Sequence, residues 1–145
     1  MREIHGFDQA PYIGALMRIG LETARSRILD ALAEAGLDDL NLSYQSLFSY
    51  PPLDGQRPSD IAKRLGMTKQ ALNHLLGQLE KMGYVERRSD PASRLATIHY
   101  TERGWRVLEV TIAAMQRLEA DWRAQIGDQR FADFKATMKE LTGEG

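Results

Sequence analysis

Polar side chains that can hydrogen-bond to nucleic-acid bases gather in the first two turns of a predicted helix, residues 68–82. They are Thr68, Lys69, Gln70, Asn73 and His74. An amide can donate to and accept from one adenine edge, and lysine can donate to guanine or phosphate. The opposite side carries leucines at three- and four-residue spacing, which predicts burial. The pattern favours a surface that contacts DNA, and an ordinary solvated helix face is the alternative.

Arginines flank a turn that follows this helix. Residues 84–88 and 95–100 are predicted strands, and the segment SDPAS between them is predicted to be a turn. Arg87, Arg88 and Arg94 would therefore lie on a projecting hairpin. Arginine suits the strongly negative potential of a narrow minor groove. The alternative is that the charges protect an edge strand from pairing with other chains.

The charge distribution agrees with a polyanion-binding segment. The chain of 145 residues has a net charge of −1, but residues 57–106 contain ten lysines and arginines and five acids. That segment carries +5 and the rest of the chain −6. A basic segment between acidic ends is typical of a nucleic-acid-binding module on an acidic scaffold, although chance can also produce it.

Helices are predicted on both sides of this basic segment. A short helix from Pro58 to Gly66 precedes Thr68, which is the predicted N-cap, so the pair forms a helix-turn-helix. A long helix is expected after Ala10 with Pro11 in its first turn, and another over residues 42–49. Two more are expected over residues 102–126 and 131–141. At ~1.5 Å per residue, the helix over residues 102–126 would be nearly 40 Å long, more than a sixty-residue lobe needs. These flanking helices therefore predict a partner.

Catalytic and metal-binding patterns are missing from the sequence. It contains no nucleophile elbow, phosphate-binding loop, dinucleotide fingerprint or zinc-protease motif. The three histidines are far apart, and there is no cysteine. No apolar run is long enough for a membrane span, and the N-terminus does not resemble a signal peptide. We expect no enzyme activity, no catalytic residue, no metal, no cofactor and no membrane partner, and a cytoplasmic protein.

The segment from Pro58 to Gly104 resembles the MarR (multiple antibiotic resistance regulator) winged helix-turn-helix family. The resemblance lies in PSDIAKRLGMTKQALNHLLGQLEKMGYVERRSDPASR followed by YTERG. It includes Ile61-Ala62, Leu65-Gly66 and the pattern Leu-Glu-x-x-Gly that ends at Gly83. Three positions depart from the family pattern. Ser93 replaces a common aspartate, Leu95 a common second arginine and His74 a frequent arginine, which predicts a weaker or pH-dependent phosphate contact at His74.

The resemblance implies a mainly α fold with a small β-hairpin wing. Residues 1–40 and 102–145 would form a helical dimerisation region, and residues 41–101 the winged lobe. A homodimer would bind a pseudo-palindromic double-stranded DNA site and regulate transcription, more often as a repressor. The helix residues listed above would contact the major groove, and Arg94 the minor groove. Further expected DNA contacts are Arg57, Ser59, Lys63 and Arg88.

Two further residue sets follow from the resemblance. A small aromatic or anionic effector would lie between the lobe and the dimer helices, lined by Tyr12, Arg18, Tyr44, Phe48 and Trp105; packing at a hinge is the alternative role. The expected dimer interface comprises Ile13, Met17, Trp122, Phe131, Phe134 and Met138. The competing functions are a winged-helix module that binds protein without binding DNA, and a small-molecule enzyme.

Overall fold

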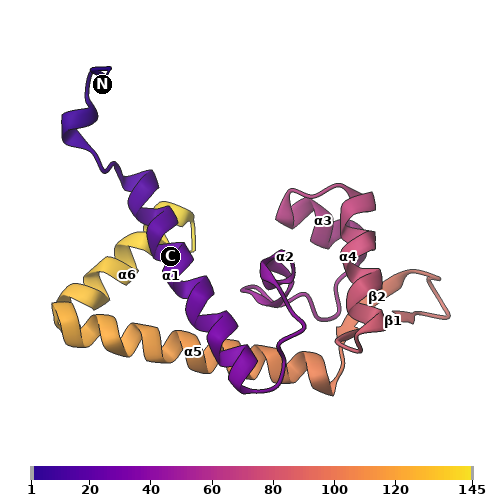
Figure 1. Cartoon of the computed structure of the whole chain (residues 1–145). Helices are drawn as coiled ribbons and strands as arrows, with labels where there is room; N and C mark the ends of the chain where they lie inside the picture. The colour runs from indigo at the N-terminus through magenta and orange to yellow at the C-terminus, as the bar shows by residue number, and fades with distance from the viewer. Residues whose placement is uncertain (1, 145) are drawn as a thin grey trace. The chain divides into compact units, whose positions relative to one another are not determined.

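The computed structural model describes residues 2–144, and the chain divides into two compact units (Figure 1). The first comprises the residues up to 27 together with those from 113 onward, and the second comprises Ile28–Ile112. Helices α1 (Ile13–Glu34) and α5 (Glu102–Ile126) contribute to both units. A mainly helical chain with one hairpin was predicted, and this is confirmed.

The second unit is a lobe built around a helix-turn-helix. After α1 come α2 (Leu42–Gln45) and a 3-10 turn, η2 (Ser46–Phe48). Then follow α3 (Pro58–Leu65) and α4 (Lys69–Lys81), which are separated by a turn at Gly66. Strands β1 (Val85–Ser89) and β2 (Ala96–Tyr100) form an antiparallel hairpin that projects beyond α4 (Figure 1). We call this hairpin, with its connecting loop, the wing.

The core of the lobe is formed by the apolar sides of these elements. Leu72, Leu76 and Leu79 of α4 are completely buried, as is Ile61 of α3. Three aromatic rings complete the core: Phe48 stacks on Tyr100 with 5.4 Å between ring centroids and meets Tyr84 edge-on at 6.0 Å. This burial explains why the polar side of α4 faces solvent, since its leucines determine how the helix is rotated.

The start of α5 is held against the end of α4. The Thr101 hydroxyl accepts from the backbone N–H of Gly104 and donates to the carbonyl of Gly83 at 2.6 Å. Arg103 forms an ion pair with Asp39 at 3.1 Å, and its guanidinium lies 4.3 Å from the Tyr84 ring centroid. The Tyr84 hydroxyl donates to Asp39, and burial, followed by this hydrogen bond, raises the pKa of Tyr84. This cluster joins the loop after α1, the loop after α4 and α5.

The first unit contains a 3-10 turn, η1 (Phe7–Gln9), the start of α1, the end of α5, and α6 (Asp128–Thr142). Arg27 of α1 donates to Asp121 of α5 at 2.5 Å. Lys135 of α6 forms an ion pair with Glu119 of α5 at 2.8 Å. These contacts connect all three helices within the unit.

Several predicted element boundaries differ from the structure. The first helix begins at Ile13, after Pro11 rather than around it, and α6 begins three residues earlier than predicted. The expected helix over residues 42–49 is a short α-helix followed by a 3-10 turn. The loop at residues 51–57 was predicted only as a break. Its Gln56 pairs with Ile98 of β2, and Ile98 donates to the Gln56 carbonyl at 2.8 Å. Through this bridge, the loop forms a short third segment of the small sheet, paired with β2.

Candidate nucleic-acid interface

The polar residues predicted to contact bases share one exposed side of α4. Thr68 is the N-cap, and its hydroxyl accepts from the backbone N–H of Ala71 at 3.0 Å. Four exposed side chains follow: Lys69, Gln70, Asn73 and His74. Within residues 2–144, none of these four side chains makes a hydrogen bond or ion pair. Their donors and acceptors are therefore available to a partner.

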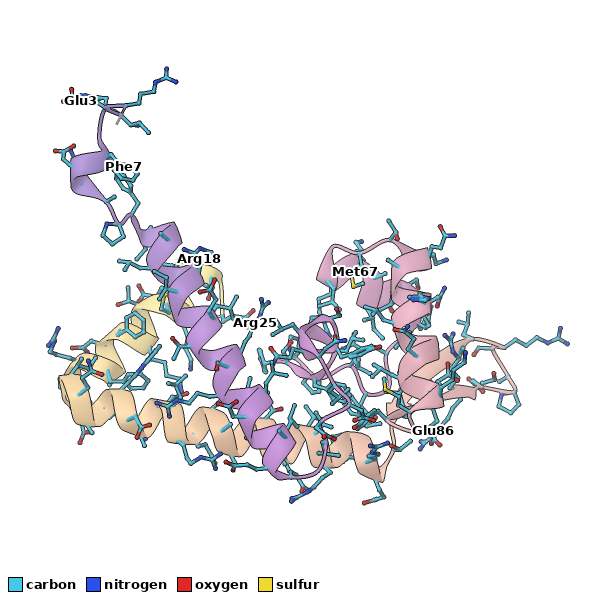
Figure 2. The ribbon with its side chains drawn as sticks, in the orientation of Figure 1. Glu3, Phe7, Arg18, Arg25, Met67 and Glu86 are labelled. Carbon is cyan, nitrogen blue, oxygen red and sulfur yellow. The ribbon has the colours of Figure 1, made fainter. Side chains whose placement is uncertain are left out.

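Helix α3 and its N-cap carry three exposed residues that were also predicted to contact DNA. Arg57 is the N-cap of α3, and Ser59 and Lys63 lie on its first two turns. The neighbouring Arg64 was not predicted as a contact; its guanidinium donates to the Gln56 side chain at 3.1 Å. That bond ties α3 to the segment paired with β2. Met67 and Glu86, labelled in Figure 2, mark the turn before α4 and the strand after it.

The arginines of the wing differ in their partners. Arg88 forms an ion pair with Glu86 at 2.6 Å, and Arg87 forms one with Glu80 of α4 at the same distance. Arg94, in the loop between the strands, is exposed, and its guanidinium has no ion pair or hydrogen bond within the described chain. It is also the one non-glycine residue with a positive φ among those described, at 56°. Of the three wing arginines, only Arg94 keeps its charge unpaired.

The residues expected around an effector fall into both units. In the lobe, Tyr44 is buried and donates to the Gln78 side chain at 2.7 Å, while Phe48 packs in the aromatic core. Trp105 is 41% exposed and meets Tyr100 edge-on at 5.1 Å. In the other unit, the Tyr12 hydroxyl donates to the Gly6 carbonyl, and Arg18 forms an ion pair with Glu22. Tyr44 and Phe48 are thus packed inside the lobe, and a role for either of them around an effector stays a prediction.

The first unit leaves many apolar side chains uncovered. On α1, Ile13 is 69% exposed and Met17 48%, and Phe134 of α6 is also exposed. Trp122 and Met138 are half-buried. By contrast, Phe131 is buried within the chain, with the Arg123 guanidinium 5.6 Å from its ring centroid. Further exposed apolar residues of this unit, which were not on the predicted interface, are Ile4, Phe7, Leu16, Ile19, Leu21 and Leu141.

Two features are absent from the described residues, a group of metal ligands and a membrane-spanning helix. No group of three or more His, Asp or Glu side chains is placed to hold a metal ion within residues 2–144. No helix of this part of the chain is long and apolar enough to cross a bilayer.

The sequence of the lobe matches a known family. Residues 52–94 match the model of the MarR family, a range that contains all of α3, α4 and β1 and ends at Arg94. The predicted resemblance to the MarR family is confirmed. None of the curated proteins matches the sequence.

Solved structures resemble the chain over both units. FabT of Streptococcus pneumoniae in complex with DNA has a TM-score of 0.75 at 16% identity, covering 90% of this chain and 93% of that one. The MepR–DNA complex of S. aureus has a TM-score of 0.67 at 20% identity, covering 97% and 98%. A MarR-family protein of Mycobacterium tuberculosis in complex with salicylic acid has a TM-score of 0.64 at 23% identity, covering 91% and 97%. At these identities the likeness establishes the predicted winged helix-turn-helix fold.

Proposed function

We propose that the protein is a sequence-specific DNA-binding transcriptional regulator of the cytoplasm and has no enzyme activity. The observation that carries this proposal is the unpaired polar side of α4, where Lys69, Gln70, Asn73 and His74 are all exposed. A helix-turn-helix places its second helix in the major groove, with N-terminal residues against base edges. The DNA complexes of FabT and MepR support the same use of this fold.

The proposed DNA contacts differ in role: some would recognise base edges, others would bind phosphates or enter the minor groove. Asn73 and Gln70 would contact base edges, because an amide distinguishes adenine from other bases. Arg57, Ser59 and Lys63 of α3 would contact phosphates, which position the protein without specifying sequence. Arg94 would enter the minor groove. Arg88 is a weaker candidate, because Glu86 already neutralises its charge.

A homodimer would present two lobes to one DNA site. The uncovered apolar side chains of the first unit, among them Ile13 and Met17, support self-association. Two-fold symmetry then implies a pseudo-palindromic site with half-sites about one helical turn apart. As in many repressors, occupation of such a site would block transcription.

An effector that releases the DNA is the second part of the proposal. The salicylic acid complex of the M. tuberculosis relative supports a small aromatic or anionic molecule. A thermal-shift screen with salicylate and related phenolic acids tests it. A rise in Tm accompanied by weaker DNA binding is expected, and no effect of any phenolic acid on either quantity would remove this part of the proposal.

The competing function is a winged-helix module that binds protein and not DNA. Such a module needs an apolar patch on the exposed side of α4. The exposed large apolar residues of the lobe are Leu42, Tyr50, Leu95, Trp105 and Ile112, and none of them lies on α4. This distribution favours the DNA-binding function.

Footprinting tests the assignment of roles. Asn73→Ala should relax base preference at one position of each half-site, at about 1–3 kcal/mol. Lys69→Ala should weaken binding, whereas Lys81→Ala, which removes the same charge at the other end of α4, should change it little. Equal effects of the two lysine variants would mean that α4 does not enter the groove N-terminus first.

A further inference from the structure

The loop of the wing is organised by one acidic residue, Asp90. Its carboxylate accepts from the backbone N–H of Ala92 and from the Ser93 hydroxyl, both at 3.0 Å. Its backbone carbonyl accepts from the N–H of Arg94 at 2.8 Å, and its own N–H donates to the carbonyl of Leu95 at 3.2 Å. Asp90 is thus bonded to every residue from Ala92 to Leu95.

Arg94 needs such support because of its backbone conformation. Its φ of 56° lies in the left-handed region, where the Cβ atom crowds the neighbouring carbonyl. A non-glycine residue keeps a left-handed backbone conformation only when surrounding interactions, such as hydrogen bonds, stabilise it. The Arg94 N–H bond to Asp90 is one such bond, and the turn closed by the Asp90 carboxylate sets the path of the chain into it.

The carboxylate itself is unfavourable for DNA binding. The Ala92 N–H, followed by the Ser93 hydroxyl, lowers the pKa of Asp90, so the group stays ionised near neutral pH. A negative charge at the tip of the wing repels phosphate. Asp90 therefore has two opposing effects on affinity, one through the conformation of the loop and one through its charge.

We propose that Asp90 is a positioning residue for DNA binding, which fixes the left-handed conformation of Arg94 so that the guanidinium can enter the minor groove. In MarR relatives an aspartate is common at the position of Ser93. Here the serine hydroxyl donates to Asp90, so the organising carboxylate stands three residues earlier. The inference rests on the proposed function, because it concerns how Arg94 reaches DNA.

A double-mutant cycle tests the proposal on duplexes selected by the wild-type protein from a random-sequence pool. Asp90→Ala should weaken binding roughly tenfold, as expected for loss of a charge-assisted contact. It should also reduce the slope of log K against log salt by about one, the same change that we expect for Arg94→Ala. In the Arg94→Ala background, Asp90→Ala should no longer weaken DNA binding. It should leave the affinity unchanged or raise it, since only the repulsive charge is then removed.

Two milder variants guard against a folding defect. Asp90→Asn keeps an acceptor for the Ala92 N–H and removes the charge, so it should bind at least as tightly as the wild type. Ser93→Ala removes one of the two hydrogen bonds to the Asp90 carboxylate and should reduce DNA affinity less than Asp90→Ala does. In the Arg94→Ala background, Ser93→Ala should not reduce the affinity. Amide hydrogen exchange without DNA should show faster exchange of the Arg94 N–H in Asp90→Ala, with α4 unchanged.

The possible outcomes separate this inference from the proposed function. Additive losses from Asp90→Ala and Arg94→Ala, with Asn73→Ala still altering base preference, would overturn the positioning role and leave the regulator intact. Failure of the pool to yield any bound duplex would overturn both. An Asp90→Ala variant that no longer weakens binding in the Arg94→Ala background, together with faster Arg94 exchange, would support both.

Discussion

Arg87 Nε donates to Glu80 Oε1 at 2.6 Å, and this ion pair joins strand β1 of the wing to the last turn of α4. About one third of each side chain is exposed, at 35% and 34%. The pair is therefore partly shielded from solvent and salt. It connects the two elements that would contact the two grooves of DNA.

We expect a measurable energetic coupling between these two residues. A double-mutant cycle with Glu80→Ala and Arg87→Ala should give about 0.5–1 kcal/mol by chemical denaturation, because partly shielded pairs reach the upper end of surface values. The pair Glu86–Arg88 lies on the same strand with 49% and 59% exposure and is the matched control. Its coupling should be smaller; a larger value for the control pair would contradict this assignment.

Gly104 should tolerate no side chain. A Cβ atom built there would lie 2.2 Å from the backbone carbonyl oxygen of Tyr84. That carbonyl accepts the N–H of Thr101 and has little freedom to move. Gly104→Ala should therefore destabilise the lobe by about 2–4 kcal/mol in thermal or chemical unfolding.

Gly77 provides the opposite case, on α4. No heavy atom lies within 4 Å of the position that its Cβ would take. Because it is inside a helix, Gly77→Ala should stabilise the protein by about 0.5–1 kcal/mol. If its lack of a side chain permits close approach to DNA, the same variant should bind DNA less tightly. A stabilised variant with unchanged affinity would place Gly77 outside the interface.

Alkaline pH should destabilise the lobe through its buried tyrosines. Burial raises the pKa of Tyr100 to about 12, above its ordinary value of 10.0. The neutral form is thus favoured in the folded state, so its stabilising effect is complete below about pH 10 and is lost between about pH 10 and 12. The loss should reach about 2–3 kcal/mol. Tyr100→Phe should flatten the dependence of unfolding free energy on pH over this range, and an unchanged dependence would contradict this role of Tyr100.

The exposed apolar residues of α1 should control assembly. Met17→Glu and Ile13→Glu would place a charge in the proposed dimer interface, where its desolvation is unfavourable. Sedimentation should show a shift from dimer to monomer, and DNA binding should weaken because one lobe alone contacts a half-site. Tyr50→Glu, an exposed apolar residue of the lobe, should leave the dimer intact. A wild-type protein that sediments as a monomer at all concentrations would contradict the dimer.

Local sequence signals predicted the elements that position the candidate surface. Thr68 before Lys69 and Thr101 before Glu102 are capping residues, and both helices begin where these caps predict. The leucine spacing of α4 predicted which side is buried, since burial follows the helical period. The exposure of the polar side could therefore be predicted from the sequence, whereas its contact with DNA stays a proposal.

Contacts between distant residues could not be predicted in this way. Nothing in the spacing of Glu80 and Arg87, or of Gln56 and Ile98, indicates that they meet, because each contact depends on how separate elements pack. The pairing of Arg88 with Glu86 had a usable signal: residues two apart on a strand share one face. The hydrogen bond from the Tyr44 hydroxyl to the Gln78 side chain likewise had no signal in the sequence, because the two residues lie on separate elements.

We propose that the first two turns of α4 contact DNA bases. The most direct measurement is selection of duplexes from a random pool by the wild-type protein and by Asn73→Ala, followed by sequencing. We predict a pseudo-palindromic consensus for the wild type, and a consensus for Asn73→Ala that loses preference at one symmetric pair of positions. Recovery of the same consensus by both proteins, or of none by the wild type, would contradict it.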